Sequence, residues 1–265
     1  MAQVREFIWS AVLLVAVATG GSAAELRPET LAGFERYVRG AEDRIQARIS
    51  GRGPFLWTDE SAERRERVRR GEALAEPFHS RGDTAAPGGL IHDWIGAVFI
   101  PGVSLAKALA LVQDYDRHAQ IYSPEVVASR VMSHQANRYR VYMRLLKKKV
   151  VTAVLNTEHE VEYNSLDAKR WYSRSYSVRV AEVENAGGRG ERELPEGRGH
   201  GFLWRLYSYW RFEERDGGVY LECQAISLTR DIPTGLGWLI EPIVRDLPKE
   251  SLLRTLEGTR RALTG

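Results

Sequence analysis

The sequence predicts an α+β fold in which a curved antiparallel sheet wraps around one long C-terminal helix, with a helical extension at the N-terminus. Two segments, 153–163 and 202–213, alternate strictly between two sets of side chains. This period of two indicates strands of a sheet with one buried face and one solvent-exposed face. Residues 235–263 instead repeat apolar positions at helical spacing. Since that apolar stripe must be buried, we expect the helix to cover the apolar face of the sheet.

The composition is that of an ordinary soluble globular protein. The chain has 265 residues, of which 43% are hydrophobic and 28% are charged. A chain of this length can bury a hydrophobic core without disulfides or a structural metal. A net charge of +3 gives no reason to expect a nucleic-acid partner. The single cysteine, Cys223, excludes an intrachain disulfide and a thiolate zinc cluster. The histidines lack metal-ligand spacing, and we expect neither a metal nor a cofactor.

Residues 1–24 have the layout of a secretory signal peptide. An apolar run at 7–18 is followed by a break and then by small residues up to Ala24, which suits cleavage before Glu25. The run is shorter than a comfortable membrane span. We therefore expect an exported protein, either periplasmic or secreted. An uncleaved N-terminal membrane anchor is the alternative.

Residues 25–88 are predicted to form an N-terminal extension. Apolar residues recur at spacings of three and four between Leu31 and Ile49, which indicates an amphipathic helix. Two short extended pieces and a charged helical turn are expected at 54–58, 72–80 and 60–71. The Gly- and Pro-rich stretch 81–89 then marks the boundary of a second segment, 89–265.

The segment 89–265 begins with a strand and a helix. An apolar run at 90–100 ends at Pro101, and Ser104 then suits the N-cap of a helix. Strand-like runs follow at 125–134, 138–147, 149–163, 169–184, 202–215 and 218–231. In the terminal helix, Pro242 and Pro248 predict a kink or a break.

Particular residues in this order resemble a known family. The stretch FIPGVSL at 99–105 leads into a helix that ends QDYD at 113–116, and IPTGLGW at 232–238 precedes the terminal helix. With these residues, positions 89–264 resemble the START-like superfamily, also called SRPBCC or the helix-grip group of polyketide cyclases, dehydrases and lipid-transport proteins. The resemblance implies a seven-stranded sheet that grips the C-terminal helix, with a cavity between them for sterols, phospholipids, fatty acids, quinones or polyketides. It implies no shared catalytic residues, and an export signal departs from the many cytosolic members.

His159 is the most informative single residue. It lies mid-strand on the apolar face, which the resemblance turns toward the cavity. There it would bond a ligand head group or act as an acid or base near neutral pH, and a core histidine with a local partner is the plain alternative. By contrast, His92 and Asp93 are neighbours on a strand, so their side chains point to opposite faces and form no oriented pair. No residue is assigned a catalytic role.

The residues expected to line the cavity are mostly large apolar or aromatic side chains with a few polar ones. They are Met143, Leu155, His159, Tyr163, Trp204, Ser208, Trp210, Phe212, Trp238 and Ile243. The alternation places Trp204, Trp210 and Phe212 on one face, where they either line a pocket or fill the core.

The function expected is that of an exported START-like domain that binds a lipid or another hydrophobic small molecule between the sheet and the C-terminal helix. Two alternatives stay open. One is a cyclase or hydrolase that acts on a polyketide-like substrate with His159 as acid or base, and the other is a structural or interaction protein with a filled core. Basic clusters at 64–70 and 147–149 leave transient contact with a membrane surface open.

Overall fold

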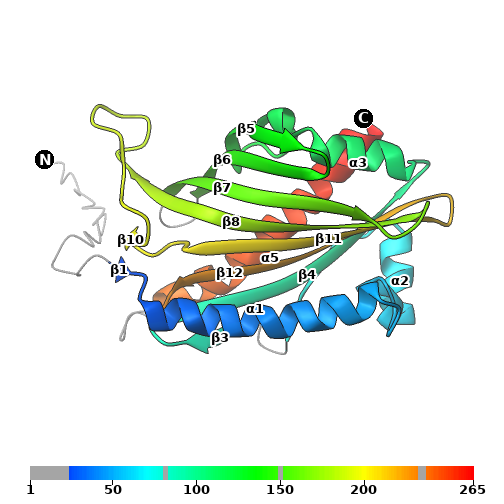
Figure 1. Cartoon of the computed structure of the whole chain (residues 1–265), viewed down its shortest axis with the longest axis horizontal. Helices are drawn as coiled ribbons and strands as arrows, with labels where there is room; N and C mark the ends of the chain where they lie inside the picture. The colour runs from blue at the N-terminus through cyan, green and yellow to red at the C-terminus, as the bar shows by residue number, and fades with distance from the viewer. Residues whose placement is uncertain (1–23, 80–82, 149–151, 232–236) are drawn as a thin grey trace, which may run out of the picture.

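The computed structural model describes residues 24–79, 83–148, 152–231 and 237–265, without the side chains of 237–245. The expected signal sequence falls outside these ranges except for Ala24. Within them the chain forms one large antiparallel sheet with helices on both faces (Figure 1). None of the described helices has the length and apolarity that crossing a membrane requires.

Seven long strands make up the sheet in the described part of the chain. Their order across the sheet is β4, β12, β11, β8, β7, β6, β5, and all neighbours are antiparallel. The strands are β4 (Gly89–Pro101), β5 (Val126–Gln135), β6 (Arg138–Lys148), β7 (Thr152–Ser165), β8 (Arg170–Glu184), β11 (Arg205–Arg215) and β12 (Gly218–Arg230). They coincide with the strand-like runs of the sequence, which confirms the predicted sheet.

Short strands extend the sheet and join the N-terminal extension to it. β2 (Leu74–Pro77) and β3 (Asp83–Ala86) both pair with β4, and β9 (Arg192–Glu193) pairs with β8. A separate two-stranded sheet pairs β1 (Ala24–Glu25) with β10 (Arg198–Gly199). The N-terminal extension therefore builds part of the same sheet as the segment that follows it.

The helices are those the sequence predicts, with one difference. They are α1 (Pro28–Ile49), α2 (Ala62–Arg69), α3 (Leu105–Gln113), α4 (His118–Ile121) and α5 (Gly237–Thr264), with 3-10 turns η1 (Trp57–Glu60) and η2 (Tyr115–Arg117). As expected, the Ser104 hydroxyl caps α3 by accepting from Lys107 N at 3.3 Å. The break expected at the prolines does not occur, because α5 continues through Pro248. Pro248 removes one backbone hydrogen bond, and packing of the following turns on the sheet outweighs that loss.

The sheet separates two apolar layers. One face, called the α5 face below, packs against the second half of α5, where Leu252 and Leu256 join a cluster with Phe212. The opposite face, called the α1 face, packs against α1, where Phe34 joins a cluster with Ile226. Figure 1 shows α1 running along one side of the sheet while α5 crosses the other side.

Polar side chains tie α1 to its face of the sheet. The Glu42 carboxylate accepts from the hydroxyls of Tyr176 at 2.5 Å and Tyr209 at 3.0 Å. The Tyr37 hydroxyl donates to Asp93 at 2.8 Å. These bonds supply partners to polar groups that would otherwise be costly to cover.

A buried ion pair lies further along the same face. Arg211 Nε donates to Glu222 at 2.7 Å, and both side chains are 1% exposed. The other carboxylate oxygen of Glu222 accepts from Trp57 N at 2.5 Å, and an Arg48 nitrogen lies 3.6 Å from the first. The pair therefore connects η1 and the end of α1 to the centre of the sheet.

Candidate ligand-binding surface on the α5 face

The register of the sheet aligns two rows of side chains across the α5 face. The first row runs from β4 to β7 through His92, Ser227, Leu206, Ser177 and His159. The second row runs through Trp94, Ala225, Ser208, Ser175 and Val161. Because side chains alternate between the faces along each strand, all ten lie on the face that α5 covers.

Small side chains occupy most of the middle of both rows, and Leu206 in the first row is the one larger side chain there. We call Ser175, Ser177, Ser208, Ala225 and Ser227 the small-residue floor. Nearer α3 the same strands carry larger side chains, such as Trp210 and Phe212, which belong to or pack against the cluster that includes Leu252 and Leu256. α5 runs from the end of β12 toward α3, so its first half lies toward the floor (Figure 1). This part of the sheet carries little side-chain bulk beneath the helix.

His159 lies at one end of the first row, 2% exposed. Its Nε2 is 3.0 Å from the hydroxyl oxygen of Thr157, which in turn donates to the carbonyl of Met143 at 3.0 Å. Its Nδ1 is buried and has no hydrogen-bond partner. Desolvation by burial lowers the pKa of His159 to about 4, so the ring is neutral at pH 7.

His92 lies at the other end of the first row, 1% exposed. Its Nε2 is 3.1 Å from the hydroxyl oxygen of Thr229, and its Nδ1 is again buried without a partner. Burial lowers its pKa to about 4. Nearby on the same face, the Trp94 indole nitrogen is also buried without a partner. As expected from their adjacency, Asp93 bonds on the α1 face and forms no pair with His92.

The two rows carry no charge at neutral pH. Their only titratable side chains are the two neutral imidazoles, and the rest are hydroxyl, aliphatic or indole groups. Among the described residues, no group of His, Cys, Asp and Glu side chains is arranged to hold a metal ion. What the surface offers is an apolar covering with a few hydrogen-bonding groups.

The end of the α5 face nearest α3 is filled by a tyrosine cluster. The hydroxyls of Tyr163 and Tyr115 lie 2.8 Å apart, and Tyr163 also donates to Val112 O at 3.3 Å. His118 Nε2 donates to the same carbonyl at 3.1 Å. These bonds satisfy a carbonyl in the last turn of α3, and burial raises the pKa of Tyr163 well above its ordinary value. Tyr163 thus serves the packing of α3 in this structure.

The expected lining residues divide between several places. Those on the α5 face are Met143, Leu155, His159, Tyr163, Ser208, Trp210 and Phe212. Of these, His159 and Ser208 belong to the two rows, and Met143 lies beside them, opposite Thr157. Trp238 and Ile243 lie in the first turns of α5, where the side chains are outside the described residues.

Trp204 departs from the alternation that placed it with Trp210 and Phe212. It packs on the α1 face, in the cluster that contains Phe34. The pairing of β11 with β12 begins only at Arg205. Before it, the Glu182 carboxylate accepts from the backbone amides of His200 and Phe202, and Gly201 has a φ of 73°. The chain turns there, so the period of two does not extend back to Trp204.

Other residues of the two rows were not singled out by the sequence. They are Trp94, Val161, Ser175, Ser177, Leu206, Ala225 and Ser227, together with the unpartnered nitrogen of His92. Small and hydroxyl side chains on a strand carry no signal of their own. Only the pairing register, which brings five strands side by side, assembles them into one surface.

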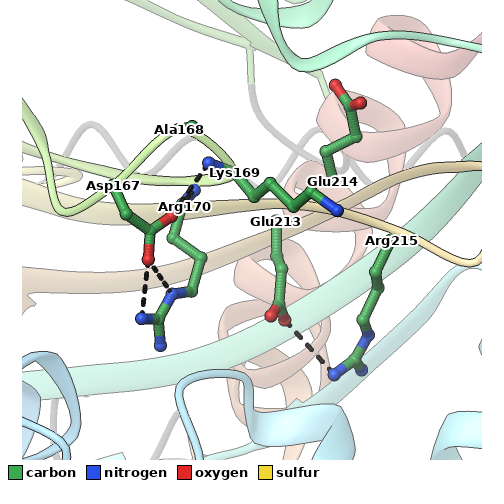
Figure 2. A pocket seen from close by; sticks show the side chains of 7 residues that line it. All are labelled: Asp167, Ala168, Lys169, Arg170, Glu213, Glu214 and Arg215. Atoms are coloured by element: carbon green, nitrogen blue, oxygen red, sulfur yellow. Dashed lines mark hydrogen bonds and ion pairs between the residues drawn. The ribbon is translucent and has the colours of Figure 1, made fainter.

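A recess of about 370 Å³ on the outer surface is a different kind of feature (Figure 2). It lies where the turn between β7 and β8 meets the end of β11. Figure 2 shows Asp167 turned to Arg170 and Glu213 turned to Arg215, with separations of 2.8 and 3.3 Å. Arg215 also bonds Asp59 in a bidentate pair at 2.9 and 2.5 Å. These charged groups satisfy one another, so this recess does not suit an apolar ligand.

Comparison with known proteins gives matches among solved structures only. No family model matches the chain, and no curated protein matches it. A STAR-related lipid transfer protein from Xanthomonas axonopodis is 16% identical over 69% of this chain and 99% of its own, with a TM-score of 0.48. The Zhui aromatase/cyclase from Streptomyces is 8% identical over 65% and 93%, with a TM-score of 0.41. Human STARD10 is 8% identical over 75% and 79%, with a TM-score of 0.42.

The architecture itself rests on the strand order and on the helix that covers the sheet. Seven long antiparallel strands in the order β4, β12, β11, β8, β7, β6, β5 carry a C-terminal helix on one face. This is the arrangement that the resemblance at 89–264 implies. The chain has the START-like, helix-grip fold.

Proposed function

We propose that this chain is an exported START-like domain that binds a hydrophobic small molecule between the small-residue floor and the first half of α5. One observation carries the proposal. Across the middle of a strongly apolar sheet face, all side chains of the two rows except Leu206 are small, and buried histidines with unpartnered nitrogens flank them. Small-molecule sites combine an apolar lining with a few placed polar groups in this way.

The source of affinity would be burial of the ligand's apolar surface, at roughly 25 cal/mol per Å². The floor supplies the area, and the histidines at its ends orient the molecule. An enzyme is not proposed for this surface. With a pKa of about 4, His159 is a weak base at neutral pH, and no carboxylate stands in either row to assist it.

Native mass spectrometry of the purified chain tests the proposal. We expect an extra mass that is lost on denaturation, or that appears when 1-dodecanol is added. Ser208→Phe places a ring in the middle of the floor and should abolish the extra mass. Ser133→Phe, at an exposed position of β5, is the matched control and should leave it unchanged. Equal loading of the wild type and Ser208→Phe would place the ligand elsewhere.

Export is a separate part of the proposal and rests on the sequence of residues 1–24. Cleavage after Ala24 would leave Glu25 at the new N-terminus, where it pairs with Arg198 of β10. The intact mass of the chain recovered from a periplasmic fraction tests this. The mass of residues 25–265 supports export with cleavage, and the full mass in the membrane fraction supports the anchored alternative.

A further inference from the structure

The hydrogen bonds around His159 define which ring nitrogen carries its proton. The Thr157 hydroxyl has one proton, and the contact with Met143 O at 3.0 Å uses it, because a carbonyl can only accept. The Thr157 oxygen must then accept from His159 Nε2, which lies 3.0 Å away. The ring is neutral, so the proton on Nε2 leaves Nδ1 as a bare acceptor.

His92 repeats this arrangement at the other end of the row. The Thr229 hydroxyl donates to Arg230 O at 3.1 Å, so its oxygen accepts from His92 Nε2 at 3.1 Å. Again Nδ1 is left as an acceptor. Two histidines on strands that are far apart in the sequence thus present the same type of unprotonated nitrogen on the same face.

Both acceptors are buried and have no partner in the folded chain. A buried polar atom without a hydrogen bond costs free energy, and native proteins keep few of them. A bound molecule that donates a hydrogen bond would remove this cost. At these two nitrogens, a molecule that brings only lone pairs, such as a carboxylate or a ketone, would leave the cost in place and add repulsion between acceptors.

We propose that the ligand is an uncharged, largely apolar molecule with a hydroxyl group, and that this hydroxyl donates to Nδ1 of His159. The inference rests on the proposed function and narrows its ligand class from lipids in general to apolar alcohols. His159 is chosen over His92 because Met143, opposite Thr157, is half-buried and not fully covered.

Calorimetric titration of the full chain with five matched compounds tests the inference. They are 1-dodecanol, its methyl ether, dodecanoate, cyclododecanol and the methyl ether of cyclododecanol. Each ether keeps the apolar body and an acceptor oxygen but loses the donor. We expect at least one alcohol to bind about tenfold more tightly than its ether, in line with one recovered hydrogen bond, and dodecanoate to bind more weakly than 1-dodecanol.

Two variants at one position separate the donor effect from general damage. His159→Gln places an amide near Nε2 and removes the acceptor at Nδ1, so the preference for alcohol over ether should fall to about onefold. His159→Asn places its amide near Nδ1, where the oxygen can accept, and should retain most of the preference. If a variant fails to fold, the titration of the wild-type chain with the five compounds still shows whether a hydroxyl donor strengthens binding.

The outcomes distinguish the inference from the function on which it rests. Equal binding of alcohols and ethers, or tighter binding of dodecanoate, would overturn the inference and leave the ligand-binding function standing. If none of the five compounds binds, the proposed function fails, and the inference fails with it.

Discussion

His92 and His159 lie at opposite ends of one cross-strand row, with Ser227, Leu206 and Ser177 between them. Four strand spacings separate them, a distance of about 19 Å. Both rings donate through Nε2 to a threonine hydroxyl, and both leave Nδ1 unpartnered. The row therefore places two equivalent acceptors at the two sides of a surface made mostly of small side chains.

The buried histidines make the fold sensitive to acid. Burial lowers the pKa values of His92, His118 and His159 to about 4, from 6.5 for the exposed side chain. Well above pH 6.5 the imidazoles are neutral in both the folded and the unfolded state, so they do not lower the stability of the folded chain. As pH falls from 6.5 to 4, the unfolded chain gains protons first, so the free energy of unfolding decreases. Each histidine contributes at most about 3 kcal/mol to this decrease.

Urea unfolding between pH 8 and pH 4.5 measures this effect. His159→Asn should reduce the part of the pH-dependent loss that comes from the buried histidines by about a third, since one of three similar groups is gone. His134 is exposed, and His134→Gln should leave the pH dependence unchanged. An unaltered slope in His159→Asn would mean that the His159 ring is already solvated or charged in the folded chain.

The Arg211–Glu222 pair should be indispensable to stability. Glu222→Gln leaves the Arg211 guanidinium buried without its counter-charge, which costs about 3–5 kcal/mol. Glu160→Gln is the matched control, because Glu160 pairs with Arg140 at the surface and such pairs contribute less than about 1 kcal/mol. Denaturant unfolding at pH 7 compares the two. Similar decreases in the free energy of unfolding for both variants would show that burial does not determine how much the Arg211–Glu222 pair contributes to stability.

The tautomers of the two row histidines can be observed directly. In the ¹⁵N-labelled chain at pH 7, long-range proton–nitrogen correlation should show Nε2 protonated and Nδ1 unprotonated in both rings. Added 1-dodecanol should shift the Nδ1 signal of His159. Protonation at Nδ1 would refute the hydrogen-bond assignment from which the ligand's donor was inferred.

The elements of the fold were predictable because each has a local cause. The strand expected at 138–147 is β6, the N-cap expected at Ser104 caps α3, and the helix expected from Gly235 is α5. Periodicity and capping chemistry act within a few residues, so a single sequence displays them. His159 was found for the same reason, as a polar residue on an alternating apolar face.

The site as a whole was not predictable, because its cause is long-range. Ser177 and Ser227 become part of one surface only through the register of five strands. Trp204 illustrates a long-range effect that misleads the sequence pattern. Its position fits the alternation of 202–213, but the Glu182 carboxylate binds the backbone amides of the loop before β11, and regular strand geometry starts only after Trp204. Where β11 begins is decided by a carboxylate more than twenty residues earlier in the chain.

Photo-crosslinking with a dodecanol analogue that carries a diazirine at the end of its chain tests whether the ligand lies between the α5 face and α5. We expect labelling of the β8 and β11 peptides that contain Ser175, Ser177 or Ser208, and we expect Ser208→Phe to prevent the labelling while Ser133→Phe does not. Labelling confined to α1 or to the outer surface, and equal in both variants, would contradict a ligand site between the α5 face and α5.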